Sequence, residues 1–175
     1  NRQRGEGPGN LESAQAYGFE VNSTFKLDNI GIEGGELDFE FFWQDTKVDD
    51  PLTGEERPLS GNTEWFSGVR YRHDIPETDY AYGFFADYFE NSPQFGLRQI
   101  SQFQWSDPFI GVFVEDKDFY GMNFRVSLNN LANGGEIFDR TFFSDFRDAP
   151  GAMQIRERRE FRFDQIVRFS LSGTF

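Results

Sequence analysis

The last residues of the chain, EFRFDQIVRFSLSGTF at positions 160–175, alternate between two kinds of side chain. Apolar or aromatic residues fill most of the odd positions: Phe161, Phe163, Val167, Phe169, Leu171 and Phe175. Polar residues fill most of the even positions. A period of two is that of a β-strand, whose successive side chains point to opposite faces of a sheet. The segment therefore predicts one long strand with an apolar face and a polar face.

The same alternation recurs along the chain. It predicts about seven strands, over residues 14–27, 36–50, 61–74, 80–91, 97–117, 120–144 and 155–175, and an irregular point in each of the last three could be a bulge or a turn. Within the fifth, Ser106-Asp107-Pro108 predicts a bend, because proline cannot donate to a strand ladder. Short turn-forming connections alternate with longer ones such as DDPLTGEERPLSG at 49–61 and RDAPGAMQ at 147–154. We therefore expect an all-β fold, an antiparallel up-and-down meander.

Composition excludes several classes of function. The chain has no cysteine and one histidine, which excludes disulfide scaffolds, thiol nucleophiles and multi-histidine metal sites. Its net charge of −13 argues against nucleic acid as a partner, since phosphate binding needs a basic surface. The 23 phenylalanines argue against disorder despite a mean hydropathy of −0.64. We expect no catalytic residues, no metal and no cofactor.

Strands with one apolar face and one polar face are typical of membrane-spanning β-barrels, whose outer surface meets lipid. An arginine on the lipid side costs about 2–4 kcal/mol at the bilayer centre. The even positions of the last strand, which include Arg168, are therefore expected to face the polar interior. The residues predicted to line this lumen are Glu20, Asp38, Arg125 and Arg168.

Several segments resemble one family of outer-membrane proteins. FDQIVRFSLSGTF at 163–175, which ends on an aromatic residue, resembles the closing strand of outer-membrane barrels. DPLTGEERPLSG at 50–61, RYRHDIPETDYAYG at 70–83, VEDKDFYGMNFRV at 114–126 and VSLNNL at 126–131 resemble the final strands of TonB-dependent outer-membrane receptors. The resemblance covers most of the chain in the expected order.

This resemblance implies a location in the bacterial outer membrane and a barrel of roughly 22 strands with a plugged lumen. Residues 1–13 would be the remnant of an outer loop and residues 14–175 the C-terminal strands. Since the chain starts at Asn1 and contains no plug, we expect a piece of a longer protein. The implied function is energised uptake of a scarce nutrient (a siderophore, cobalamin or a carbohydrate), without enzymatic activity.

The resemblance also implies partners and site residues. The partners would be outer-membrane lipid, the barrel-assembly machinery, the TonB complex through the missing plug, and a small-molecule substrate. In such barrels the closing strand is the assembly signal, which here comprises Val167, Phe169, Leu171 and Phe175. The residues expected to help bind substrate lie in one outer loop: Asp50, Thr53, Glu55, Glu56 and Arg57.

Some groups of residues leave two interpretations open. The acidic loop could offer oxygen ligands to calcium, but its spacing does not fit an EF-hand, and a solvated loop is the simpler interpretation. The arginines at 156, 158, 159 and 162 could bind lipid phosphates or form salt bridges with Asp145, Asp148 and Glu157. His73 is interpreted as a polar residue beside a turn.

Three other functions compete with the importer. The main alternative is a complete small outer-membrane barrel with an adhesin or structural role. An outer-membrane barrel enzyme would need a cluster of histidine with aspartate or serine, which one histidine makes improbable. A soluble, lipocalin-like barrel would place the aromatic residues inside and the charges outside.

Overall fold

The computed structural model describes residues 13–173, which form antiparallel strands and one short 3₁₀ turn. Within this range the structure contains no α-helix, and so no helix with the length and hydropathy needed to span a membrane. The elements are β1 (Gln15–Lys26), η1 (Asp28–Ile30), β2 (Gly35–Asp49), β3 (Glu56–Arg57), β4 (Thr63–Asp74), β5 (Tyr80–Asn91), β6 (Gln94–Phe95), β7 (Gln99–Trp105), β8 (Phe109–Phe119), β9 (Met122–Asn129), β10 (Gly135–Phe143), β11 (Gln154–Arg162) and β12 (Ile166–Ser172).

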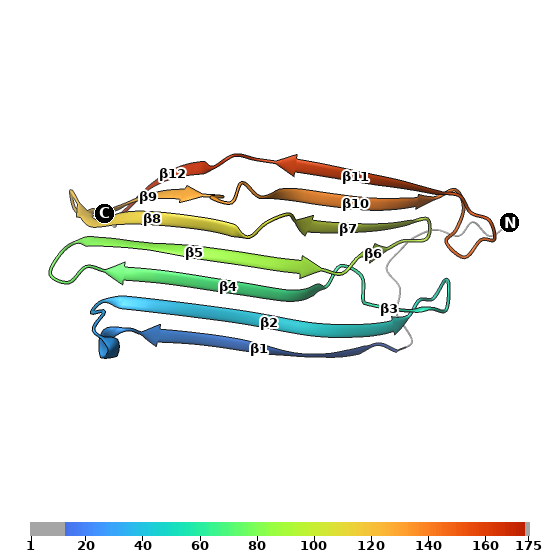
Figure 1. The fold of residues 1–175 in the computed structure, drawn as a ribbon, viewed down its shortest axis with the longest axis horizontal. Coiled ribbons are helices and arrows are strands. Elements are labelled where there is room, and N and C mark those ends of the chain that lie inside the picture. Colours follow the sequence, from blue (N-terminus) through green and yellow to red (C-terminus); the bar gives the residue numbers. More distant parts are fainter. Residues whose placement is uncertain (1–12, 174–175) are drawn as a thin grey trace.

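The strands form two hydrogen-bonded sheets that continue one another (Figure 1). The main sheet has the order β1-β2-β4-β5-β8-β9-β12, with β3 paired to β2, and the second has the order β11-β10-β7-β6. Every pairing is antiparallel, which confirms the predicted all-β antiparallel meander. The longer connections gather at one end of the sheet and the short turns at the other.

The first four predicted strands are continuous, as β1, β2, β4 and β5, whereas each of the last three is split in two. The interruptions at 106–108, 130–134 and 163–165 lie side by side, and we call this line of breaks the seam. Asn130 stands at its centre, fully buried and with a φ of 60°. Its side-chain amide donates hydrogen bonds to the carbonyls of Gly134 (3.0 Å) and Phe163 (2.7 Å). The bend predicted at Ser106–Pro108 is therefore present, together with two breaks whose positions the sequence did not predict.

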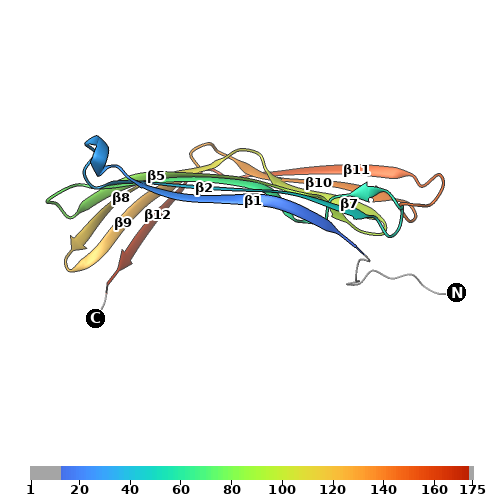
Figure 2. The same ribbon diagram turned by 90° about the horizontal axis from the view of Figure 1, so that it is seen from below.

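The described residues form a curved, single-layered sheet (Figure 2). Beyond the seam, β8, β9 and β12 curve away from the rest of the sheet. Only three apolar side chains among the described residues are buried, those of Val48, Ala81 and Phe113. A sheet with an apolar face ordinarily buries that face against another layer. Here no second layer of residues 13–173 covers it.

The sheet is open: residues 13–173 do not close into a barrel, and their place in the wall of a larger barrel stays a prediction. Within residues 13–173, β1 pairs only with β2, and β12 pairs only with β9. Six antiparallel steps separate these two edge strands, so they run in the same direction. Closing one copy on itself would therefore require a parallel pairing of β1 with β12, unlike every other pairing in the sheet.

Residues that lie opposite each other on neighbouring strands share one face of the sheet. One row of partners crosses seven strands with apolar side chains throughout: Phe25, Leu37, Tyr71, Phe84, Val112, Leu128 and Val167. The next row crosses the same strands on the opposite side: Lys26, Glu36, Arg72, Gly83, Phe113, Ser127 and Arg168. We call these two sides of the main sheet the apolar face and the polar face.

Candidate functional site

The apolar face exposes large side chains along its whole width. Phe19 on β1 is 54% exposed, and Phe169 on β12, at the opposite edge, is 68% exposed. Aromatic rings concentrate near both ends of the strands. Trp65 packs against Tyr88 with ring centroids 5.2 Å apart at one end, and His73 stacks on Tyr82 at 5.1 Å at the other. Between these two bands the face is mostly apolar, with Val69 on β4 and Phe84 and Ala86 on β5.

The polar face carries all four residues that the sequence assigned to a lumen, Glu20, Asp38, Arg125 and Arg168. Their location on one face follows from the strand register. That this face lines a lumen stays a prediction from the sequence.

Much of the charge on the polar face is paired across strands. Arg70 lies 3.1 Å from Asp87 and 3.5 Å from Glu40, each on a neighbouring strand. Arg72 lies 2.8 Å from the buried Glu115 carboxylate. These pairs leave the face hydrophilic without requiring a second protein layer.

The polar face also contains aromatic residues that interrupt the alternation. Phe42, Phe66 and Phe89 lie opposite one another on β2, β4 and β5. Trp105 packs near this group, with its ring centroid 6.4 Å from that of Phe89 and 5.7 Å from that of Phe163 at the seam. Trp105, the last residue of β7, therefore contacts rings of the polar face.

The predicted assembly signal lies on β12, the edge of the main sheet. Val167, Phe169 and Leu171 project from its apolar face and are all more than half exposed. Phe175 lies outside the described residues. One flank of β12 has no hydrogen-bonded strand among residues 13–173, so its backbone groups are available to another strand.

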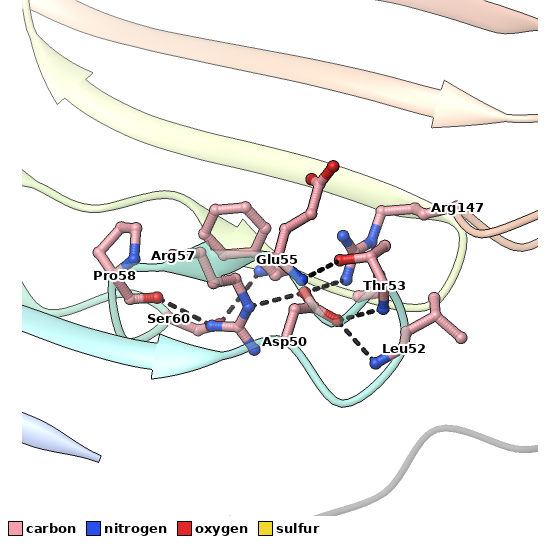
Figure 3. A network of polar contacts seen from close by, with 10 residues as sticks. Asp50, Leu52, Thr53, Glu55, Arg57, Pro58, Ser60 and Arg147 are labelled. Carbon is pink, nitrogen blue, oxygen red and sulfur yellow. Dashed lines mark hydrogen bonds and ion pairs between the residues drawn. The ribbon is translucent and has the colours of Figure 1, made fainter.

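The predicted substrate-binding loop forms a network of polar contacts at the end of the sheet where the long connections gather (Figure 3). Asp50 is 3% exposed. One of its carboxylate oxygens accepts hydrogen bonds from the amides of Leu52 (2.8 Å) and Thr53 (3.3 Å). The other oxygen accepts from Arg57 Nε (2.7 Å) and Arg147 Nη2 (2.6 Å).

Both arginines are fixed by further contacts. Arg147 Nε donates to the carbonyl of Gly96 at 2.6 Å, and Arg57 Nη1 donates to the carbonyl of Pro58 at 2.8 Å. Both guanidiniums lie over the ring of Phe95, at 4.6 Å for Arg57 and 5.6 Å for Arg147. We call the group of Asp50, Arg57, Phe95, Gly96 and Arg147 the loop junction. It joins three connections that are far apart in the sequence.

The charge of Asp50 is stabilised inside this junction. Burial by itself would raise the pKa of the carboxyl group. Hydrogen bonds from Arg147, the Leu52 amide, Arg57 and the Thr53 amide outweigh that effect and lower the pKa from 3.8 to about 2. The carboxylate is therefore ionised at neutral pH and its acceptor positions are occupied by the protein itself.

The five residues predicted to bind substrate thus differ in their surroundings. Asp50 and Arg57 are engaged in the loop junction, which gives them an observed structural role. Thr53 is half-buried, while Glu55 and Glu56 are exposed, with Glu56 3.0 Å from Lys47. Sequence reasoning did not identify Arg147 or Phe95. The only signal was that Arg147 begins a long connection on the same side as residues 49–61.

The arginines of β11 form local ion pairs. Arg159 pairs with Glu157, and Arg158 lies 3.1 Å from Glu160 and 3.5 Å from Asp139. Arg162 lies 3.5 Å from Glu160. Among the described residues these arrangements favour the salt-bridge interpretation for three of the four arginines. Of the three acidic residues expected as partners, Glu157 is the one found in these pairs.

Two further features bear on chemistry within the described residues: the environment of His73 and the placement of side chains that could bind a metal. His73 accepts or donates a hydrogen bond with the Tyr71 hydroxyl at 2.8 Å, beside the turn after β4. Within residues 13–173 no group of three or more metal-ligating side chains is arranged to hold an ion.

Comparisons of the whole chain with models of known families, with curated proteins and with solved structures found no match.

Proposed function

We propose that the chain forms part of the wall of a bacterial outer-membrane β-barrel, as the C-terminal strands of a TonB-dependent receptor that imports a scarce nutrient. The observation that carries this proposal is the apolar face, which crosses seven strands without a covering layer among residues 13–173. Lipid would supply that missing layer. The family assignment itself rests on the sequence segments that resemble these receptors.

The distribution of aromatic rings supports a membrane-facing role for the apolar face. In transmembrane barrels, aromatic girdles flank an apolar band about 25 Å tall. The pairs Trp65–Tyr88 and His73–Tyr82 lie near opposite ends of β4 and β5. The eight steps from Trp65 to His73 span about 27 Å of strand at ~3.4 Å per residue, and a tilted strand covers a smaller height across the bilayer. The spacing of the two bands is therefore compatible with one bilayer.

The strand directions favour a piece of a larger barrel over a complete small one. Bacterial single-chain barrels have an even number of strands, so that all neighbours are antiparallel. The parallel orientation of β1 and β12 prevents such a closure within residues 13–173. In the proposed receptor, further strands of the same wall pair with these two edges. The loop junction then holds three outer connections in fixed positions at the rim.

The orientation can be tested with spin labels, because the chain contains no native cysteine. Arg168→Cys and Phe169→Cys variants of the full chain are labelled and refolded into phosphatidylcholine vesicles. We expect the label at 169 to be relaxed by oxygen, which concentrates in lipid, and the label at 168 by a water-soluble nickel chelate. A wet position 169 beside a dry position 168 would contradict the membrane-facing role.

The importer function requires a different test. The reading frame upstream of Asn1 should encode a plug domain and further strands with alternating apolar residues. If it encodes neither, the receptor proposal fails even when the lipid orientation is correct.

A further inference from the structure

The polar face contains a cavity beside the seam that the proposed function does not use. It has a volume of about 350 Å³ and is formed by β5, β8, β9 and β12. This is within the lower part of the size range of small-molecule sites. The side chains that matter for its chemistry are those of Phe85, Phe109, Arg125, Ser127, Arg168 and Ser170.

The two arginines give this cavity a charge opposite to that of the whole protein. Among the described residues, its lining includes two guanidinium groups and no carboxylate, in a chain of net charge −13. Arg125 lies opposite Ser170, and Arg168 lies opposite Ser127 on the same pair of strands. The two arginines are thus diagonal neighbours, whose Cα atoms are typically about 7–8 Å apart. One anionic group can lie within reach of both.

The two guanidiniums differ in how firmly they are held. Arg125 lies over the ring of Phe113 at 3.6 Å and is 3.7 Å from Glu115. Glu115 forms its shorter ion pair with Arg72, so it neutralises Arg125 only in part. Arg168 is exposed and forms no ion pair with any other residue of 13–173. The pair combines one positioned cation with one that is free to approach a ligand.

Aromatic rings form an apolar wall next to the charged groups. Phe85 and Phe109 pack with ring centroids 5.8 Å apart. The absence of a side chain at Gly111 makes room for the first ring, because a Cβ there would lie 2.4 Å from Phe85 Cε1. Ser127 and Ser170 also line the cavity. An anionic head next to an apolar body matches this arrangement.

We propose that this cavity binds a small organic acid. Arg125 and Arg168 bind its carboxylate, since guanidinium groups pair with carboxylates through directed hydrogen bonds. Phe85 and Phe109 contact its apolar part. The inference rests on the proposed function, in which the polar face is in contact with water, and it specifies the chemical class of the ligand carried along that face.

The probe is 4-fluorobenzoate, followed by ¹⁹F NMR with the full chain in detergent micelles. We expect saturable line broadening that 4-fluorobenzyl alcohol, which has the same ring but no charge, does not show. Acetate should compete at least tenfold more weakly than benzoate, because it lacks the apolar part. Equal broadening by the alcohol would overturn the role of the arginines, and equal competition by acetate would overturn that of the rings.

Arg168→Gln should weaken binding of 4-fluorobenzoate at least tenfold. The matched control is Arg70→Gln, which removes a positive charge from the same face outside the cavity and should change binding less than twofold. Unchanged binding in Arg168→Gln, or an equal loss in both variants, overturns the proposal. If the spin labels show a wet position 168 and no binding is observed, only this inference fails. If position 168 is dry, the proposed contact of the polar face with water is itself wrong.

Discussion

The main sheet exposes apolar side chains to its surroundings, whereas the loop junction buries a charged side chain. In the main sheet, large apolar side chains such as Phe169 and Leu171 are more than half exposed. At the loop junction, a charged residue, Asp50, is almost completely buried. Across the described residues three apolar side chains are buried, against eight polar or charged ones. Among residues 13–173 the buried carboxylate of Asp50 is paired within the chain, whereas the apolar face has no covering layer.

The stability of the two regions should therefore respond to different changes. Removing a partner from a buried ion pair leaves the other charge uncompensated, whatever surrounds the protein. A charge placed on the apolar face is harmful only where lipid covers that face. The following predictions test this difference, beginning with the largest expected effect.

Asp50→Asn should lower the free energy of unfolding by about 3–5 kcal/mol. The substitution leaves the guanidiniums of Arg57 and Arg147, which are 13% and 9% exposed, without their shared carboxylate. Urea titration of the chain in lipid vesicles provides the measurement. Glu55→Gln, at an exposed position in the same loop, should change the free energy of unfolding by less than about 0.5 kcal/mol. A loss below about 1 kcal/mol for Asp50→Asn would mean that the junction contributes little to stability.

Leu171→Arg should prevent insertion into vesicles, while Ser170→Arg should be tolerated. The two residues are neighbours on β12 but lie on opposite faces. An arginine on the lipid side costs about 2–4 kcal/mol near the centre of the bilayer, whereas one on the polar face remains in water. The measured quantity is the fraction of protein that becomes protease-resistant in vesicles. Equal insertion of both variants would refute the assignment of the faces.

Asn130→Ala should cost about 1–3 kcal/mol, because two buried carbonyls at the seam lose their hydrogen-bond donor. Asn133→Ala is the matched control, since Asn133 has a similar positive φ of 51° but is exposed. Equilibrium unfolding of the two variants separates backbone strain from lost hydrogen bonds. If both lose the same stability, strain alone accounts for the effect and the seam does not depend on the amide.

Acid should weaken the loop junction gradually. The pKa of Asp50 is about 2 in the folded chain, against 3.8 for an aspartate without these contacts. Between pH 2 and pH 3.8 the folded state therefore binds fewer protons than the unfolded state. The stabilisation is complete above pH 3.8 and is lost as the pH falls through 2. Wild type and Asp50→Asn, compared by urea titration from pH 5 to pH 2, should converge in stability. Parallel curves would contradict the assigned pKa.

The sequence predicted some features because they depend on local backbone geometry. Alternation of Arg168 with Phe169 was enough to place them on opposite faces, and Pro108 was enough to predict a bend. The positions of the breaks at 130–134 and 163–165 were not predicted, because the hydrogen bonds between these breaks depend on strand register.

The candidate sites show the same division. The connection at 49–61 was singled out from its turn formers and charges, but one partner of Asp50 is Arg147, 97 residues later in the chain. The cavity next to Arg168 also combines residues from four strands. Neither grouping is visible in a linear pattern, because it requires knowing which strands are neighbours.

By itself, then, the sequence determined which segments are extended and the chemical character of their two faces, since successive side chains of an extended backbone point in opposite directions. The tertiary structure decided which residues meet across strands, where the sheet bends and which charges are buried. Those features depend on hydrogen bonds and ion pairs between residues far apart in the chain. Such contacts form only after the register of every strand is fixed.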